Sequence, residues 1–292
     1  MFETFQPVRR LYQRNGADLY LCRDRRTQQF VVIKQIHYAL YVNEADPCRR
    51  ESDETDDHAI ERAKHEAAVM FKLSEAGPLD HVVGCDEVQW HDESVLIRMP
   101  YYAGGDLLSL LERQPSHRLP EQQALSLFFQ IVQGVQCLHD NGIGHRDLSL
   151  ENVLIDDDNK LKICDFGLSV GAAASSKECV GKRNYMAPEV VAGVEYNPIQ
   201  ADVWSLGILL FIMLTGSPLF DVARISDNRF RAVQRVGVGG VLRQWRLQDA
   251  ISQSTVQLMT DMLCTSPSDR LRSVDQVLER LVSSGVRGDL EV

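Results

Sequence analysis

Three oxygen-bearing side chains lie close together in the sequence, those of Asp147, Asn152 and Asp165. An aspartate can orient a hydroxyl group and accept its proton, and carboxylate and amide oxygens are suitable ligands for Mg²⁺. Between Asn152 and Asp165, the runs V-L-I at 153–155 and L-K-I at 161–163 flank a polar run, which predicts two short strands joined by a turn. Such a hairpin would bring Asn152 and Asp165 into one cleft as ligands of a metal ion.

The residues around these side chains match two known motifs. The run from His145 to Asn152 reads H-R-D-L-S-L-E-N, and the run that begins at Asp165 reads D-F-G. These runs fit the catalytic loop H-R-D-L-x-x-x-N and the metal-binding turn D-F-G, so the chain resembles a eukaryotic-type protein kinase of the serine/threonine kind. The resemblance covers about residues 8–282. It implies transfer of the γ-phosphoryl group of Mg²⁺-bound ATP to a protein hydroxyl group, with Asp147 as the base and Asn152 and Asp165 as metal ligands.

The fold implied by the resemblance is α+β and bilobal, with a single protein kinase domain over residues 1–292. Residues 1–100 would form a small lobe, an antiparallel sheet with a helix called αC, and residues 101–292 a larger, mainly helical lobe. A chain of 292 residues with 44% hydrophobic residues can bury cores of this size. The net charge is −10, with 31 basic and 41 acidic residues, which argues against binding of nucleic acid or anionic membranes.

The cysteines and the N-terminus favour an intracellular protein. The seven cysteines are scattered without a C-x-x-C pair, which predicts neither a disulfide framework nor a zinc site and favours a reducing compartment. The start of the chain has no basic segment followed by an apolar one, and the most apolar stretch, 206–214, is too short to span a bilayer. We therefore expect a soluble, cytoplasmic protein. Acidic residues in 41–58 indicate a polar loop, either a solvated linker or a recruitment segment.

Strand patterns in the small lobe lead to a lysine that is expected to hold phosphates. Alternating residues between 8 and 36, with turn residues at 14–16 and 24–27, predict three antiparallel strands. The third strand reads V-V-I-K up to Lys34, where the family has V-A-I-K. The resemblance implies that Lys34 binds the α- and β-phosphates as a point charge and that Val32 tightens the ceiling of the adenine pocket.

A helix that follows is expected to hold this lysine in place. Apolar residues recur at helical spacing from 59 to 76, and Gly-Pro ends the pattern. This helix would be αC, and Glu66 in its middle would pair with Lys34 and hold it toward the phosphates. Glu61 is a rival candidate for this pairing.

The glycine-rich loop of the family is the largest departure from the pattern. At the three glycine positions stand Tyr12, Arg14 and Ala17, and Gly16 lies one place early. Glycines there let backbone N–H groups approach the phosphates, whereas side chains hinder the approach. Arg14 either supplies a compensating cation to ATP or is a solvated residue at an ordinary hairpin tip.

The strand predicted at 95–99 leads into P-Y-Y-A-G-G-D-L, which resembles the hinge between the two lobes. By this alignment Met99 is the gatekeeper of the adenine pocket. The resemblance implies that adenine contacts the backbone carbonyl of Pro100 and both backbone groups of Tyr102, so the N–H group that proline lacks is not needed. Asp106 would either cap the next helix or contact ribose.

Several features are expected to build the large lobe. An amphipathic helix is predicted at 121–141, and an almost wholly apolar helix, which only the centre of a large lobe can bury, opens at Asp202. The resemblance implies that Asp202 anchors the backbone of the catalytic loop and that Arg270 pairs with Glu189 of the A-P-E motif. The run Gly-Val-Gly-Gly at 237–240 is expected to be a loop.

The activation segment runs from the D-F-G turn to the A-P-E motif, with Ser175 and Ser176 at its crest. The resemblance implies that Arg146 binds a phosphate on this segment. A phosphoserine at Ser175 or Ser176 would then order the segment through charge-assisted hydrogen bonds. The alternative is a flexible alanine-serine loop without regulation.

Two residues look exchanged relative to the serine/threonine kinases. In that group a lysine two residues after the catalytic aspartate and a threonine after the activation-segment glycine contact the aspartate, and the lysine also contacts the phosphate. Here Ser149 stands at the lysine position and Lys182 at the threonine position. We expect Lys182 to restore the cation beside Asp147 as a catalytic residue. The alternative is a solvated lysine that contacts the substrate.

Two functions from different classes fit these observations. An active kinase is the leading hypothesis, because every residue expected in direct contact with the chemistry is present. The run N-Y-M-A-P-E at 184–189 favours serine/threonine specificity. The alternative is a pseudokinase that acts as a signalling scaffold, and the replaced glycines favour it.

Overall fold

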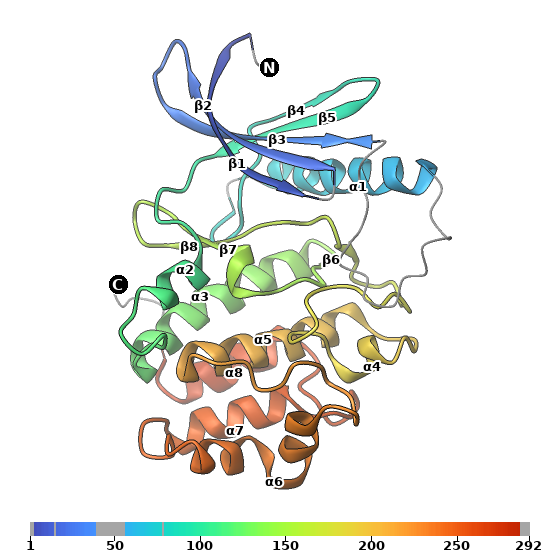
Figure 1. Ribbon diagram of the computed structural model, residues 1–292. Coiled ribbons are helices and arrows are strands. Elements are labelled where there is room, and N and C mark those ends of the chain that lie inside the picture. Colours follow the sequence, from blue (N-terminus) through green and yellow to red (C-terminus); the bar gives the residue numbers. More distant parts are fainter. Residues whose placement is uncertain (1–2, 15, 39–55, 78, 287–292) are drawn as a thin grey trace.

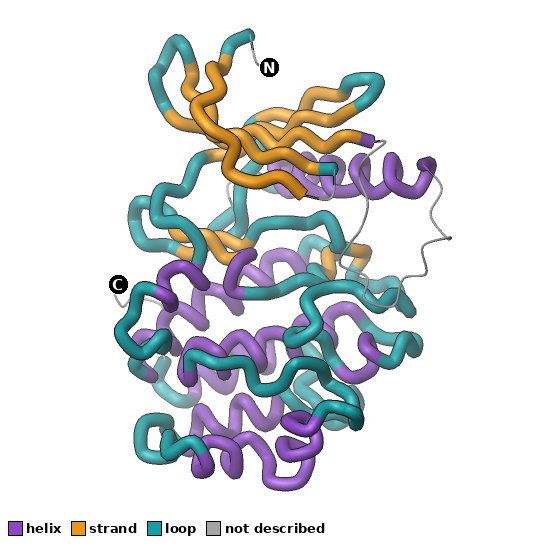
Figure 2. Tube along the Cα trace, viewed as in Figure 1, coloured by secondary structure: helices purple, strands orange, loops and turns teal. Residues whose placement is uncertain are grey.

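The computed structural model describes residues 3–14, 16–38, 56–77 and 79–286, without the side chains of residues 14, 56–60 and 62. The described residues form two lobes, with a sheet and one helix above a group of helices (Figure 1). Figure 2 shows the same division by type, with long strands in the upper lobe only. This arrangement confirms the predicted α+β, bilobal fold. The acidic segment 41–58 lies almost wholly outside the described residues.

The upper lobe is built on a five-stranded antiparallel sheet with the order β1-β2-β3-β5-β4. Its strands are β1 (Phe5–Arg14), β2 (Ala17–Asp24), β3 (Phe30–His37), β4 (Glu87–Trp90) and β5 (Ser94–Pro100). The three strands expected between residues 8 and 36 are confirmed, with both turns in the expected places. Strand β4 has four residues, E-V-Q-W, which alternate between polar and apolar but are all half-exposed or exposed. Its pairing with β5 therefore depends on the neighbouring strand.

Helix α1 (Asp56–Glu75) packs against β5 in the upper lobe. The apolar side chains on its inner side recur at helical spacing and are buried: Ala63, Ala67, Met70 and Leu73. Glu66 belongs to the same buried side and is 2% exposed. The helix therefore directs one carboxylate toward the sheet.

The lower lobe is a group of helices around α5. Its helices are α2 (Leu107–Glu112), α3 (Glu121–Asp140), α4 (Pro188–Val191), α5 (Pro198–Thr215), α6 (Asn228–Gln244), α7 (Gln253–Met262) and α8 (Val274–Ser283). Asn197 caps α5, because its side chain accepts hydrogen bonds from the backbone N–H groups of Ile199 and Gln200. Among the described residues, α5 is the one helix long and apolar enough to cross a membrane, but 83% of it is buried inside the protein. It is the core helix of this lobe.

Two short two-stranded sheets lie between the five-stranded sheet and the core helix (Figure 1). Strands β7 (Val153–Ile155) and β8 (Leu161–Ile163) form the predicted hairpin, and β6 (Ile143–Gly144) pairs with β9 (Val170–Gly171). The backbone N–H of Cys164 donates to the carbonyl oxygen of Asn152 at 3.0 Å. The β7–β8 hairpin thus brings Asn152 beside the start of the D-F-G turn, as predicted.

The run 237–240 is not a loop, and this prediction is wrong. The run lies inside α6, which bends at Gly237, where φ is 68° and ψ is 172°. Beyond the bend, Val238, Val241 and Leu242 are buried in the lower lobe, where α6 packs against α7. Burial of these side chains outweighs the low helix propensity of glycine, which is about 1 kcal/mol per residue relative to alanine.

Candidate active site

Lys34 lies at the centre of a chain of charges between the two lobes. It projects from β3 and forms an ion pair with Glu66 of α1. Its Nζ also donates to Oδ1 of Asp165 at 3.2 Å. The rival candidate, Glu61, is exposed on α1. The structure therefore forms the predicted pair of Lys34 and Glu66 and extends it to Asp165.

Asp165 and Asn152 present oxygen atoms suited to a magnesium ion. The ammonium group of Lys34 holds the pKa of Asp165 below its usual value, so this carboxylate is ionised at neutral pH. The amide nitrogen of Asn152 donates to Asp147, which leaves the side-chain oxygen of Asn152 to bind a cation. Within the described ranges, no group of three or more His, Cys, Asp or Glu side chains could hold a metal ion. A small set of hard oxygen donors fits Mg²⁺, which keeps several waters and binds phosphate oxygens at the same time.

Asp147 is held by hydrogen bonds from two segments. Nδ2 of Asn152 donates to its carbonyl oxygen at 2.7 Å and to its Oδ2 at 2.9 Å. The backbone N–H of Lys182 donates to its Oδ1 at 3.2 Å. Burial, and then the negative charge of Asp165, raise the pKa of Asp147 to about 7. A carboxylate with a pKa near neutrality can take up a proton and release it at the pH of the cell.

The backbone of the catalytic loop is anchored by Asp202 of the core helix α5. The backbone N–H groups of His145 and Arg146 each donate to its carboxylate at 2.8 Å, as the sequence predicts. Nε2 of His139 lies 2.9 Å from the same carboxylate. Arg146 has a φ of 66°, a left-handed conformation that non-glycine residues adopt only when the surrounding structure holds them. The buried carboxylate thus fixes the strained residue next to Asp147.

The residues expected to contact adenine lie where β3 and β5 approach the hinge. Val32 lies opposite Met99 in the register of these strands, and Val31 lies opposite Pro100. Tyr102 follows in the hinge and is half-buried, and its burial raises the pKa of its hydroxyl group to about 12. The structure brings these residues together. Their contact with adenine stays a prediction.

The hairpin of β1 and β2 stands where the glycine-rich loop is expected. Arg14 lies opposite Ala17, and Gly16 adopts a φ of 71°, which glycine accepts without strain. Ala17 is 6% exposed, whereas Tyr12 is 46% exposed. The side chain of Arg14 lies outside the described residues, so its contact with phosphates stays a prediction. Glycines at these positions would let the backbone approach phosphates more closely.

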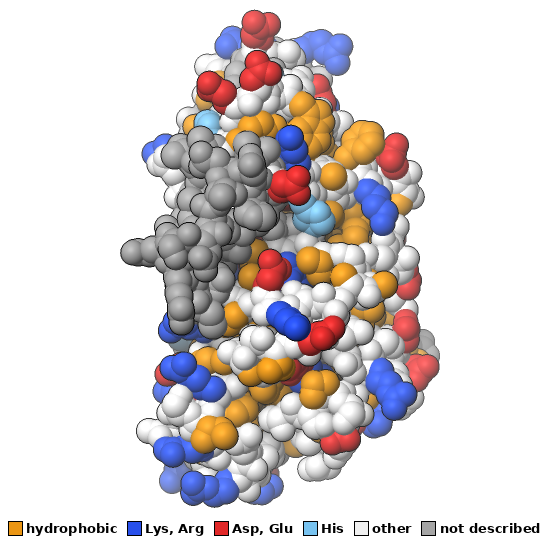
Figure 3. Space-filling view, turned by 90° about the vertical axis from the view of Figure 1, so that its right-hand side faces the viewer, with side chains coloured by type: hydrophobic (Ala, Val, Ile, Leu, Met, Phe, Trp, Pro, Cys, Tyr) orange, Lys and Arg blue, Asp and Glu red, His pale blue; other side chains and the backbone are white. Residues whose placement is uncertain are grey.

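The activation segment is tied to Arg146 by a carboxylate. Nη1 of Arg146 lies 2.6 Å from Oε2 of Glu178, and it donates to Oγ of Ser176 at 2.9 Å. Figure 3 shows acidic, basic and histidine side chains gathered on one face where the two lobes meet. The sequence analysis did not include Glu178. An acidic residue two positions after Ser176 could have indicated a partner for Arg146. The carboxylate of Glu178 therefore gives Arg146, in the unmodified chain, the negatively charged partner that the sequence analysis expected from a phosphoserine.

Replacing Glu178 with glutamine is expected to lower turnover about threefold to tenfold. The amide keeps the size of the side chain but loses a charge-assisted hydrogen bond, and the partial exposure of the pair limits the effect. The matched control is Glu195→Gln, because this carboxylate accepts a hydrogen bond from Ser175 instead of Arg146. Wild-type protein treated with a phosphatase should keep its activity in the same assay. Loss of activity on dephosphorylation, with full activity of Glu178→Gln, would show that phosphate orders the segment.

Lys182 lies against the catalytic loop, as the exchange hypothesis predicts. Its Nζ is 2.8 Å from Oγ of Ser149, which is fully buried. The same Nζ is 3.1 Å from Oε1 of Glu151. The sequence hypothesis did not include Glu151. The structure brings Ser149 and Lys182 together beside Asp147.

Three further charged residues that the sequence analysis singled out make structural contacts. Nη1 and Nη2 of Arg270 contact the two carboxylate oxygens of Glu189 at 2.6 and 3.0 Å, which confirms the predicted pair. Asp106 accepts a hydrogen bond from the backbone N–H of Ser109 at 2.7 Å, so it caps α2, the simpler of its two predicted roles. These residues position the site and lie outside its chemistry.

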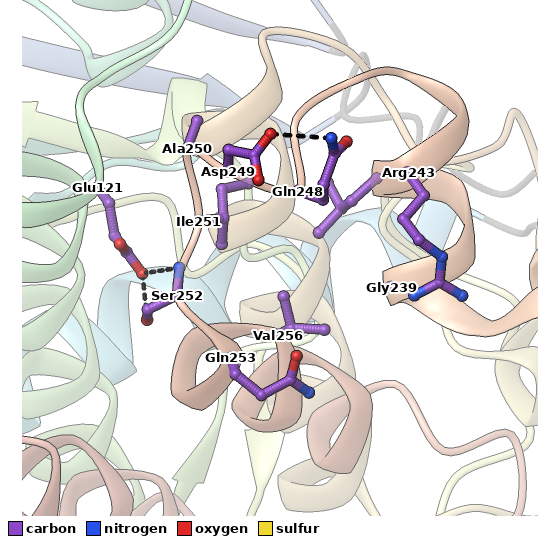
Figure 4. Close-up of a pocket in the computed structure, with 11 residues that line it drawn as sticks. Glu121, Gly239, Arg243, Gln248, Asp249, Ala250, Ile251, Ser252, Gln253 and Val256 are labelled. Atoms are coloured by element: carbon purple, nitrogen blue, oxygen red, sulfur yellow. Dashed lines mark hydrogen bonds between the residues drawn. The ribbon is translucent and has the colours of Figure 1, made fainter.

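A separate pocket lies far below this site in the lower lobe. Figure 4 shows it between α6, α7 and the start of α3. Oε1 of Glu121 accepts hydrogen bonds from the backbone N–H and the Oγ of Ser252, at 2.9 and 2.6 Å. None of the predicted site residues lines this pocket. It is a gap where helices pack against one another, and it is distinct from the candidate active site.

Comparisons with known proteins agree with this geometry. The family model for the protein kinase domain matches residues 9–282. CBL-interacting protein kinase 25 of Oryza sativa subsp. japonica is 30% identical over 273 residues, which cover 91% of this chain and 48% of that protein. Serine/threonine-protein kinase SAPK3 of the same subspecies is 31% identical over 278 residues, which cover 93% of this chain and 75% of that protein.

A third relative comes from a distant organism. Serine/threonine-protein kinase cds1 of Schizosaccharomyces pombe is 32% identical over 221 residues, which cover 73% of this chain and 46% of that protein. The chain spans about half the length of this relative and of CBL-interacting protein kinase 25. The match to the family model, over residues 9–282, includes the segments that carry the candidate site.

Proposed function

We propose that this chain, which belongs to the protein kinase family, transfers the γ-phosphoryl group of Mg²⁺-bound ATP to a serine or threonine hydroxyl group of a protein. The observation that carries the proposal is the chain of charges from Glu66 through Lys34 to Asp165, next to the oriented carboxylate of Asp147. The serine/threonine names of the relatives support the choice of hydroxyl group.

Each of these side chains has a task in the proposed reaction. When bound, ATP would supply the phosphoryl group, and Mg²⁺ would offset the negative charge of its phosphates. Glu66 would hold Lys34 toward the phosphate oxygens, and Asp165 and Asn152 would hold the metal ion. Asp147 orients the attacking hydroxyl group and accepts its proton. These tasks require Lys34 and Glu66 of the upper lobe to lie next to Asp165, as they do here.

A signalling scaffold without catalytic activity is the second candidate function. The β1–β2 hairpin favours it, because Tyr12 and Ala17 stand where the family has glycines, which let the backbone approach phosphates. A scaffold of this kind would bind partners through the kinase fold and would not require ATP. Nucleotide binding therefore separates the two candidates.

Removal of magnesium is expected to weaken ATP binding at least tenfold. Without the metal ion, the carboxylate of Asp165 faces the negative phosphates, whereas a bound ion neutralises both. Isothermal titration of the purified chain with ATP, in Mg²⁺ and in EDTA, measures this difference. Adenosine is the control, because it has no phosphates and its affinity should not depend on Mg²⁺. Failure to bind ATP in either condition would favour the scaffold, and equal affinities would contradict the metal-binding roles of Asn152 and Asp165.

A further inference from the structure

The activation segment brings an ammonium group to the catalytic loop beside Asp147. Gly181 has a φ of 103°, and a Cβ atom there would lie 2.6 Å from the carbonyl oxygen of Arg146. Glycine at this position therefore allows the segment to approach the loop closely. The next residue, Lys182, follows this approach with its backbone N–H 3.2 Å from Oδ1 of Asp147.

The side chain of Lys182 is fixed by two residues of the catalytic loop. Its Nζ is 2.8 Å from Oγ of Ser149 and 3.1 Å from Oε1 of Glu151. Ser149 is completely buried, so the surrounding residues hold its hydroxyl group in place. The side chains of Lys182 and Glu151 are 35% and 39% exposed, and an ion pair at this exposure contributes little to stability. The arrangement orients the ammonium group more than it stabilises the fold.

In the proposed reaction, negative charge builds up beside Asp147, next to which Lys182 lies. The oxygen of the substrate hydroxyl group attacks the γ-phosphorus, and the bond from this phosphorus to the oxygen that bridges to the β-phosphate breaks. The bond electrons leave with ADP, and the hydroxyl proton passes to Asp147. Charge in the transition state is spread over the γ-phosphoryl oxygens, which cations in fixed positions stabilise. Lys34 is expected to bind the α- and β-phosphates from the upper lobe, whereas Lys182 stands on the side of Asp147.

We propose that Lys182 is a catalytic residue whose ammonium group contacts the γ-phosphoryl oxygens during transfer, with Ser149 and Glu151 as its positioning residues. This role rests on the proposed kinase function and assigns one step of it. Because Lys182 comes from the activation segment, the cation reaches Asp147 only when this segment is ordered. Ordering of the segment and completion of the catalytic site are therefore one event.

The first test compares Lys182→Met with Arg183→Met. Arg183 is the adjacent cation and is exposed, so it is the matched control for a general effect of charge. Lys182→Met should lower kcat about 100-fold, as loss of one preorganised transition-state contact does, and Arg183→Met should not lower it. Binding of Mg²⁺-ADP with aluminium fluoride, which imitates the transferring phosphoryl group, should weaken by a similar factor in Lys182→Met. Binding of Mg²⁺-ADP alone should stay within about twofold, because the ammonium group contacts only the transferred group.

The second test exchanges the two positions. Lys182→Thr should be as slow as Lys182→Met, and adding Ser149→Lys should recover much of kcat, because the cation returns to the loop. Glu151→Gln should lower kcat less than Lys182→Met does and leave the KM for ATP unchanged, as expected of a positioning residue. Thermal unfolding of each variant shows whether it is folded.

Three results would overturn the assignment. The first is a kcat of Lys182→Met within threefold of that of the wild type. The second is binding of Mg²⁺-ADP with aluminium fluoride to Lys182→Met as tight as to the wild type. The third is a kcat of the double variant, Lys182→Thr with Ser149→Lys, no higher than that of Lys182→Thr alone, which would contradict the exchange of positions. Absence of transfer by the wild type would instead refute the proposed kinase function and, with it, this role.

Discussion

Replacing Asp165 with asparagine is expected to lower turnover on the order of 10³-fold while the chain remains folded. The substitution removes one negative charge and almost no volume. It therefore removes the negative charge with which Asp165 would bind the magnesium ion, without creating a cavity. Asp165 also contacts Nζ of Lys34 at 3.2 Å, but Lys34 keeps its ion pair with Glu66 in the variant. The loss should appear in the chemical step and in the metal dependence of ATP binding.

Steady-state kinetics at several Mg²⁺ concentrations measure this effect. The matched control is Asp157→Asn, an exposed aspartate in the turn between β7 and β8. Thermal unfolding of Asp165→Asn should show a midpoint close to that of the wild type. Turnover near that of the wild type, in a folded Asp165→Asn variant, would show that Asp165 is not the magnesium ligand.

Local sequence signals predict most of the elements that carry the site. The alternation before Lys34 predicts three strands, and the runs V-L-I and L-K-I on either side of 156–159 predict the hairpin beside Asn152. Both patterns work because neighbouring strands pair through short turns, so the contacts are close in sequence. The helical spacing around Glu66 likewise places its carboxylate on the buried side of α1.

The sequence predicts less where contacts join distant segments. The run 237–240 has the composition of a loop but is part of α6, because Val238, Val241 and Leu242 are buried in the lower lobe. Strand β4 is short and depends on pairing with β5, a contact that its own four residues do not encode. Such elements are decided by tertiary packing, which outweighs local propensity.

The motifs predict which residues belong to the site better than they predict the links between them. The pair of Lys34 and Glu66 follows from motif spacing and is formed in the structure. The contacts of Glu178 with Arg146 and of Glu151 with Lys182 do not follow from a motif. Each joins an activation-segment residue to the catalytic loop, and the path of that segment is determined only by the folded chain.

Replacing Asp147 with asparagine is expected to lower turnover about 10²- to 10⁴-fold. An amide cannot accept the hydroxyl proton, yet it has nearly the same shape as the carboxylate. The hydrogen bonds from Nδ2 of Asn152 and the backbone N–H of Lys182 orient Asp147, and a carbonyl oxygen in the variant can accept only part of this set. Binding of Mg²⁺-ATP should be retained, because Asp147 takes part in the transfer and does not hold the nucleotide.

The most direct test of the proposed kinase activity is transfer of radiolabelled phosphate from the γ-position of ATP to a general protein substrate. The wild type and Asp147→Asn are compared at equal concentration in Mg²⁺ and in Mn²⁺, and the labelled amino acids are identified after hydrolysis. We predict label on serine or threonine with the wild type, and a loss of at least about 100-fold with Asp147→Asn. No transfer by wild-type protein with either metal, or equal transfer by both proteins, would contradict this account.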